Sequence, residues 1–231
     1  MKRKTLICIA SLLLVYLGAV AYLGFCANTY RKLIHSECDP RSLGEGSITC
    51  LWRVGSEDDV KAVPSWWQIV RGARPTRIHF ANADPKDSDS YARLAKALRF
   101  FGTLEKISIS GPGDGVMTFV SQVGRQKHLT GFFSFRAPIT DQINESLAKF
   151  PKLQDVAIES GLFTGSDFPK LFNLRILDVS ASAISAEGLR DMAQCPNLKF
   201  IKIGDHPGPS PELIRVAAEL KASHPNLDIR L

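Results

Sequence analysis

Side chains that commonly carry out catalysis are scarce in this 231-residue sequence. It contains neither the G-x-S-x-G motif of serine hydrolases nor the H-E-x-x-H motif of zinc proteases. No two of its five histidines have the spacing of metal ligands; they are His35, His79, His128, His206 and His224. These absences argue against an enzyme, and we predict no catalytic residue, no metal site and no cofactor.

A phosphate-binding loop is also missing. Residues 111–115, G-P-G-D-G, resemble such a loop only in their glycine content. No lysine follows, and Pro112 lacks the backbone N–H that would contact an anion. We interpret this segment as a turn.

The sequence has little excess charge outside its N-terminus. The net charge is +6, but Lys2, Arg3 and Lys4 contribute three of these charges and the first acidic residue is Glu37. The rest of the chain holds 26 basic and 23 acidic residues. Because a nucleic-acid-binding domain usually carries a clear basic excess, we predict no nucleic-acid partner.

Residues 5–27 carry no charge and are mostly apolar. As a helix they would rise about 34 Å, enough to cross the roughly 30 Å hydrocarbon core of a bilayer. We predict that residues 1–27 form a signal anchor, a single transmembrane helix that is not removed. The alternative is cleavage near Ala21, after the small-x-small sequence that begins at Ala19. The apolar run continues to Phe25, which favours the anchor.

The charges that flank the run favour an N-terminus inside the cell. Lys2, Arg3 and Lys4 precede it and Arg31, Lys32 and Arg41 follow it, so the N-terminal amino group and the short basic tail decide the balance. The rest of the chain is then expected outside the cytoplasmic membrane. There, Cys38 and Cys50 either form a disulfide or remain two thiols, and the sequence leaves both open.

Two short regions connect the anchor to the main domain. We expect residues 28–55 to be a linker, since they are rich in glycine and polar residues, with a short strand at 48–54. We expect residues 56–75 to be an N-terminal cap with a helix beginning at Glu57 and a second over 64–72. Trp66 and Trp67 either cover the end of the core or form a ligand-binding surface, and we favour the cap.

Residues 76–231 repeat a strand followed by a helix. The strands are expected to start at Thr76, Leu104, Leu129, Leu153, Leu174, Leu198 and Leu227, with spacings of 28, 25, 24, 21, 24 and 29 residues. The residues three and five positions later should point into the core: Ile107 and Ile109, Val156 and Ile158, Leu177 and Val179, Ile201 and Ile203. In residues 129–135, either Phe132 or the pair Phe133 and Phe135 points inward. Helices are expected at 89–101, 140–150, 186–195 and 211–223.

A second column of residues lies three positions before the strand starts. It is mostly apolar and would end each helix on the core side: Phe101, Gln126, Phe150, Leu171, Cys195 and His224. Gln126 is the exception to the apolar pattern. We predict that Cys195 is a buried core thiol and not a nucleophile.

The L-x-x-L-x-L pattern of residues 174–179, the helix after it and the restart at Leu198 resemble a leucine-rich repeat. The chain is most similar to the long-repeat, helix-containing subtype, and the segment before the repeats resembles those of bacterial members. The resemblance implies an α/β fold, a short solenoid with parallel strands on its concave face and helices on its convex face. The chain departs from the family at the position of the usual asparagine or cysteine, where it has Pro112, Ala137, Gly161, Ser182 and His206. Of these, only Ser182 and His206 can bond the backbone through a side chain.

Strand residues between the inward ones should lie on the concave face, which solenoids use for binding. Ile176 and Phe200 are apolar there, and Asp178 and Lys202 are their charged neighbours. We predict that these four form a protein-binding surface of a membrane-anchored domain whose partner is another protein. The alternatives are that other elements cover the pair, that the domain is a secreted binder, or that it is the regulatory subunit of an enzyme complex.

Overall fold

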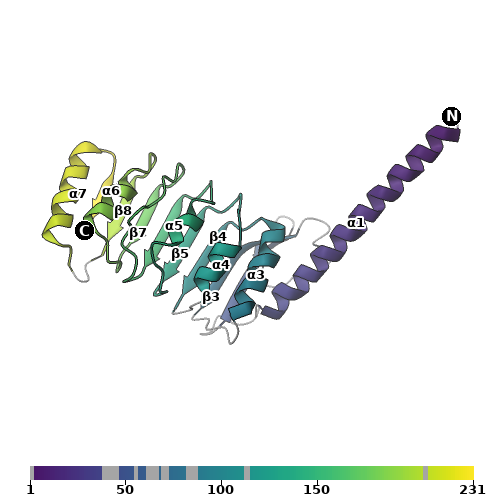
Figure 1. Cartoon of the computed structure of the whole chain (residues 1–231), viewed down its shortest axis with the longest axis horizontal. Coiled ribbons are helices and arrows are strands. Elements are labelled where there is room, and N and C mark those ends of the chain that lie inside the picture. The colour runs from purple at the N-terminus through teal and green to yellow at the C-terminus, as the bar shows by residue number, and fades with distance from the viewer. Residues whose placement is uncertain are drawn as a thin grey trace.

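The fold is α/β, with one nine-stranded sheet and helices on one of its faces, seen in a computed structural model (Figure 1). The structure describes residues 3–37, 47–54, 57–60, 68, 73–81, 88–111, 115–204 and 208–231, with side chains for 13–34, 50–51, 68, 73–80, 91–111, 115–204 and 208–231. The strand order is β2-β1-β3-β4-β5-β6-β7-β8-β9. From β3 onward every pairing is parallel, and the chain advances along the sheet one strand at a time.

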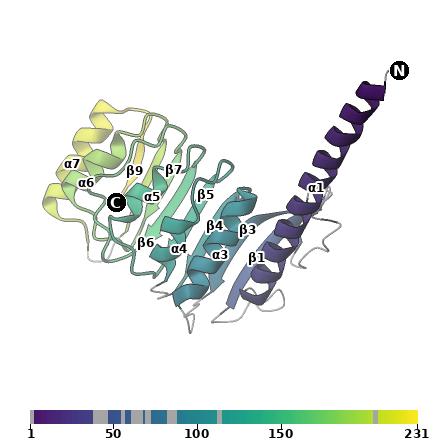
Figure 2. The same cartoon turned by 45° about the vertical axis from the view of Figure 1, so that its right-hand side comes forward.

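Helix α1 (Arg3–Glu37) leaves the N-terminal end of the sheet as a single long rod (Figures 1 and 2). Among the described residues, its segment Leu13–Ile34 is long and apolar enough to cross a membrane. The helix continues ten residues past Ala27, and this last part packs on α3 (Ser88–Phe101), where Ile34 is fully buried. The Tyr30 and Phe100 rings are in contact, with centroids 4.7 Å apart and planes tilted by 33°. Residues 28–37 therefore belong to the folded layer, in contrast to the linker expected there.

The N-terminal edge of the sheet is antiparallel. Strand β1 (Ser47–Val54) lies between β2 (Glu57–Val60) and β3 (Arg74–Ala81) and runs antiparallel to both. The strand expected at 48–54 is thus present, but the helix expected to begin at Glu57 is wrong. Pairing with β1 outweighs the preference of acidic residues for a helix N-terminus. Trp66 and Trp67 lie outside the described residues, as does Cys38 of the possible disulfide.

The central strands share one register, which places a row of apolar side chains in the core. The strands are β4 (Lys106–Ser110), β5 (Gly131–Phe135), β6 (Asp155–Glu159), β7 (Ile176–Val179), β8 (Phe200–Ile203) and β9 (Asp228–Arg230). The row that begins at Ile78 of β3 passes through Ile107, Phe132, Val156, Leu177, Ile201 and Ile229, each at most 1% exposed. Neighbours in this row are 21 to 29 residues apart in the sequence. The predicted inward pairs are confirmed as buried in all four strands.

Strand β5 points Phe132 inward and Phe133 and Phe135 outward, which decides between the two expected arrangements. Its second inward position is Ser134, fully buried between Ile109 and Ile158. Because one of the two inward positions is a serine while both outward positions are phenylalanine, the pattern of apolar residues alone could not show which face of β5 is buried.

The helices over the sheet are α3, α4 (Val116–Gln122), α5 (Ile143–Leu147), α6 (Ala186–Ala193) and α7 (Pro211–Ser223). Those expected at 89–101, 186–195 and 211–223 are present to within two residues, and the one expected at 140–150 is shorter. Ser185 caps α6 by accepting a hydrogen bond from the Gly188 amide at 2.9 Å. Helix α4 was not anticipated because valine and phenylalanine are weak helix formers, yet Val116, Phe119 and Val120 are buried in the core.

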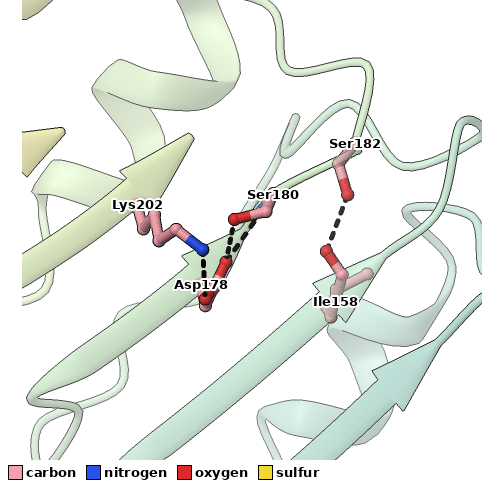
Figure 3. Close-up of polar contacts among 5 residues, drawn as sticks. All are labelled: Ile158, Asp178, Ser180, Ser182 and Lys202. Atoms are coloured by element: carbon pink, nitrogen blue, oxygen red, sulfur yellow. Dashed lines mark hydrogen bonds and ion pairs between the residues drawn. The ribbon is translucent and has the colours of Figure 1, made fainter. Parts of the chain in front are cut away.

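Polar side chains tie consecutive units together at their turns. Ser182 Oγ donates to the Ile158 carbonyl at 2.7 Å (Figure 3). It also accepts from the Ser160 amide at 3.1 Å, so Ser182 bonds backbone as expected, but in the preceding unit and not locally. Gln126, the exception in its column, is fully buried, and its Oε1 accepts from the Leu104 amide at 3.2 Å. Both side chains satisfy backbone groups that would otherwise be buried without partners.

Candidate functional site

The face of the sheet opposite the helices is the open face, and the four predicted binding residues all lie on it. The strand register pairs Ile176 of β7 with Phe200 of β8, and Asp178 with Lys202 two positions later. Neighbouring parallel strands are about 4.8 Å apart, so each pair is in direct side-chain reach. The structure therefore brings together an apolar pair and a charged pair, as the sequence predicted.

The charged pair is held in place. Lys202 Nζ lies 3.4 Å from Asp178 Oδ2, and Asp178 Oδ1 accepts from both the amide and the hydroxyl of Ser180 (Figure 3). Because Ser180, the first residue after β7, also holds the carboxylate, the position of Asp178 does not depend on the lysine alone. This leaves Lys202, which is about half exposed, able to exchange its partner for a ligand group.

The apolar pair is accessible to different degrees. Ile176 is 46% exposed, so nearly half of this aliphatic residue is open to solvent. Phe200 is half-buried, because the Arg230 guanidinium lies over its ring at 4.9 Å from the centroid. Arg230 Nε in turn donates to Asp228 Oδ2 at 3.1 Å. Among the described residues, the helices lie on the other face of the sheet (Figure 1), and Arg230 lies over the Phe200 ring.

Arg230 and Asp228 are two residues of the open face that the sequence analysis missed. They lie on β9, whose register partners are Phe200 and Lys202 of β8. The strand begins one residue closer to Leu227 than β8 does to Leu198, so the positions counted from the leucine in the other strands do not locate its open-face residues. The alternation of Asp228, Ile229 and Arg230 was the available signal.

The apolar surface continues diagonally toward the middle of the sheet. Phe133 of β5 and Ala157 of β6 lie in the next row of the open face, two residues further along their strands than the row that contains Ile176 and Phe200. The Phe133 ring lies flat over Gly131, where an added Cβ would come within 2.7 Å of ring atom Cε2. Phe133, Ala157, Ile176 and Phe200 form a diagonal apolar strip across four strands, with Asp155 on one side and the Asp178–Lys202 pair on the other.

The described residues offer few groups suited to chemistry. No cluster of three or more histidine, cysteine or acidic side chains suited to a metal occurs among them. Cys195 is 4% exposed, as predicted, and burial raises the pKa of its thiol. Burial also raises the pKa of Cys50 strongly and lowers the pKa of His79 on the open face. The raised pKa values favour neutral thiols at neutral pH, which does not suit a cysteine nucleophile.

No protein-family model matches the chain, and a search of curated proteins finds no match.

Proposed function

We propose that the chain is a membrane-anchored leucine-rich repeat protein that binds another protein through the open face of its sheet. The proposed family assignment is supported by six consecutive parallel steps of 21 to 29 residues along one row of buried side chains. In such a solenoid the strand face is the usual site of binding.

The observation that carries the binding proposal is the diagonal apolar strip with charged residues on both sides. Neighbouring apolar side chains on a surface are a common feature of protein contact sites; here Phe133, Ile176 and Phe200 are the accessible members, and Ala157 between them is 8% exposed. An apolar centre bordered by charged groups is the common composition of a protein interface. Asp178, Lys202 and Arg230 are placed to discriminate between partners by charge, while Ile176 and Phe200 supply the buried area.

The anchoring proposal is supported by the exposure of α1. Leu13, Leu14, Val15, Tyr16, Leu17, Val20, Tyr22, Leu23 and Phe25 are each 41% to 71% exposed. So many exposed apolar side chains on one helix suit a lipid environment. The basic residues before the run favour an N-terminus inside, with the sheet outside the cytoplasmic membrane.

Site-specific photocrosslinking in native membranes tests the binding proposal. A photoreactive phenylalanine analogue replaces Ile176 in one full-length variant and Phe172 in another; Phe172 is a 71% exposed residue in a turn off the sheet. We expect one discrete crosslinked product from position 176, none from position 172, and loss of the first when Phe200→Ala is added. Equal products from both positions, or a product that Phe200→Ala leaves unchanged, would show that the open face is not the interface. A product recovered only with a soluble fraction would favour the secreted form.

A further inference from the structure

A basic hollow lies on the helix side of the molecule, between α3 and the ends of α4 and α5. It has a volume of about 780 Å³, and its charged lining residues are all cations: Arg93, Lys96, Arg99, Arg125 and Lys149. Arg93, Lys96 and Arg99 recur every third residue of α3 and so share one face of that helix. This concentration contrasts with the near balance of charges in the rest of the chain after the apolar run.

Four of these five cations lack an acidic partner among the described residues. Lys96, Arg99, Arg125 and Lys149 form no ion pair within the described part of the chain. Glu145 shares a neighbouring hollow of about 390 Å³ with Lys149 but does not line the basic hollow itself. All five side chains are exposed, so an external anion can reach them and offset their mutual repulsion.

Backbone geometry shapes the wall of the hollow. Gly124 has φ of +71°, and a Cβ at that position would lie 3.0 to 3.2 Å from Cδ, Nε and Cγ of Arg99. The absence of a side chain at Gly124 lets the Arg99 stem lie against the backbone at the end of α4. Its guanidinium is thereby kept in the hollow beside Arg125.

The hollow lies beside the point where α1 stops being exposed. Arg93 and Lys96 also line a second hollow of about 350 Å³, together with Phe25, Cys26 and Thr29 of α1. Along α1, Phe25 is 70% exposed whereas Ala27 is 9% exposed and Ile34 is fully buried. The cations of α3 thus stand level with the end of the apolar run. If the run fills the hydrocarbon core, that level is the one occupied by lipid headgroups.

We propose that the basic hollow binds the phosphate-bearing headgroups of anionic phospholipids in the membrane that α1 enters. The proposal rests on the anchoring proposed above. Arginine and lysine are the usual partners of phosphate oxygens, and basic residues next to a membrane helix strengthen attachment to anionic lipid. Because the last turns of α1 are packed on α3, the hollow is held at a constant height above the bilayer. Binding headgroups there would fix the tilt of the whole sheet, and with it the direction in which the open face points.

Native mass spectrometry of the full-length chain, released from nanodiscs of mixed phosphatidylglycerol and phosphatidylcholine, tests the proposal. The hollow variant is Lys96→Gln, Arg99→Gln, Arg125→Gln; the matched control, Lys170→Gln, Lys199→Gln, Lys221→Gln, removes the same charge from exposed sites near α6 and α7. We expect wild type and control to retain phosphatidylglycerol preferentially. The hollow variant should lose it by about tenfold or more, since each basic residue near a bilayer contributes about fivefold. Circular dichroism checks that both variants fold.

Several outcomes would contradict the lipid site. Equal loss in both variants would mean that general charge, and not the hollow, attracts the lipid. Thermal stabilisation of wild type by inorganic phosphate in pure phosphatidylcholine nanodiscs, with no preference for phosphatidylglycerol, would mean a site for soluble anions. A chain that does not remain in the nanodisc would contradict the anchor and the lipid site together, whereas one that remains without preference contradicts the lipid site alone. Both variants keep Ile176 and Phe200, so loss of partner binding would not affect the result.

Discussion

The two faces of the sheet are built from alternating residues of the same strands, yet they differ sharply in composition. On the core face, the row from Ile78 to Ile229 is apolar in all seven strands and at most 1% exposed. On the open face, the neighbouring row contains Lys106, Gly131, Asp155, Ile176, Phe200 and Asp228. Packing restricts the first row to one chemical class, while the second is free to vary. The residues of the core face therefore indicate the fold, whereas the residues of the open face can vary and determine what is recognised.

The largest effect is expected from Leu177→Ala on the core face. Leu177 is fully buried between Val156 and Ile201, so truncation should leave a cavity and cost about 2 to 5 kcal/mol of unfolding free energy. Neighbouring units should unfold with it, because each is stabilised by the next. Urea unfolding followed by circular dichroism measures the loss. An unchanged midpoint would mean that the core face of β7 is assigned wrongly.

The core face was also the part most accessible from sequence. Leu177, Val179, Ile201 and Ile203 are buried as predicted, because a solenoid-like period of apolar residues is dictated by packing and is visible without coordinates. Positions at which polar side chains link neighbouring units were harder to predict from the sequence. Asn173 and Asn197 donate to the carbonyls of Pro151 and Phe172, at 2.7 and 2.6 Å, and so link neighbouring units. An asparagine stands one residue before both Leu174 and Leu198. This recurrence was the sequence signal for a row of side-chain hydrogen bonds at the turn before each strand, whereas the sequence analysis looked for one at the turn after it.

The N-terminal region was predicted least well, for a physical reason. Its strands pair antiparallel, and β1 and β2 are held by long-range hydrogen bonds that no local period encodes. The continuation of α1 through Ile34 is likewise determined by packing on α3, although Tyr30, Leu33 and Ile34 recur at helical spacing. On the open face, the pairing of Ile176 with Phe200 followed from the repeat, whereas the Arg230 contact depended on the irregular start of β9.

An intermediate effect on the fold is expected from Phe200→Ala. The ring is half-buried and contacts the exposed Arg230, so its loss should cost the fold about 1 kcal/mol, less than Leu177→Ala. Capture of the crosslinked partner should instead weaken about 30-fold, since truncating an aromatic anchor commonly costs about 2 kcal/mol of binding free energy. Titration of the purified partner by biolayer interferometry, beside urea unfolding, separates the two effects.

Phe172→Ala is the matched control for that measurement. It removes the same ring from a site that is 71% exposed and off the sheet, so both stability and capture should stay near wild type. If Phe200→Ala destabilises as much as Leu177→Ala, Phe200 belongs to the core and the contrast between faces fails at β8. If neither property changes, the interface lies elsewhere.

The smallest effect on the fold is expected from the charged pair on the open face. A double-mutant cycle of Asp178→Asn and Lys202→Gln should give a coupling energy of about 0.2 to 1 kcal/mol, because both side chains are partly exposed at a separation of 3.4 Å. The coupling should decrease as salt is raised from about 0.05 to 0.5 M, since shorter Debye lengths screen exposed charges. Asp178→Asn alone should destabilise more than Lys202→Gln, because the carboxylate also accepts the two Ser180 hydrogen bonds. Chemical unfolding at both salt concentrations measures all four proteins. A coupling well above 1 kcal/mol that salt leaves unchanged would make the pair part of the fold, and the open face would then lose its charged residues as determinants of recognition.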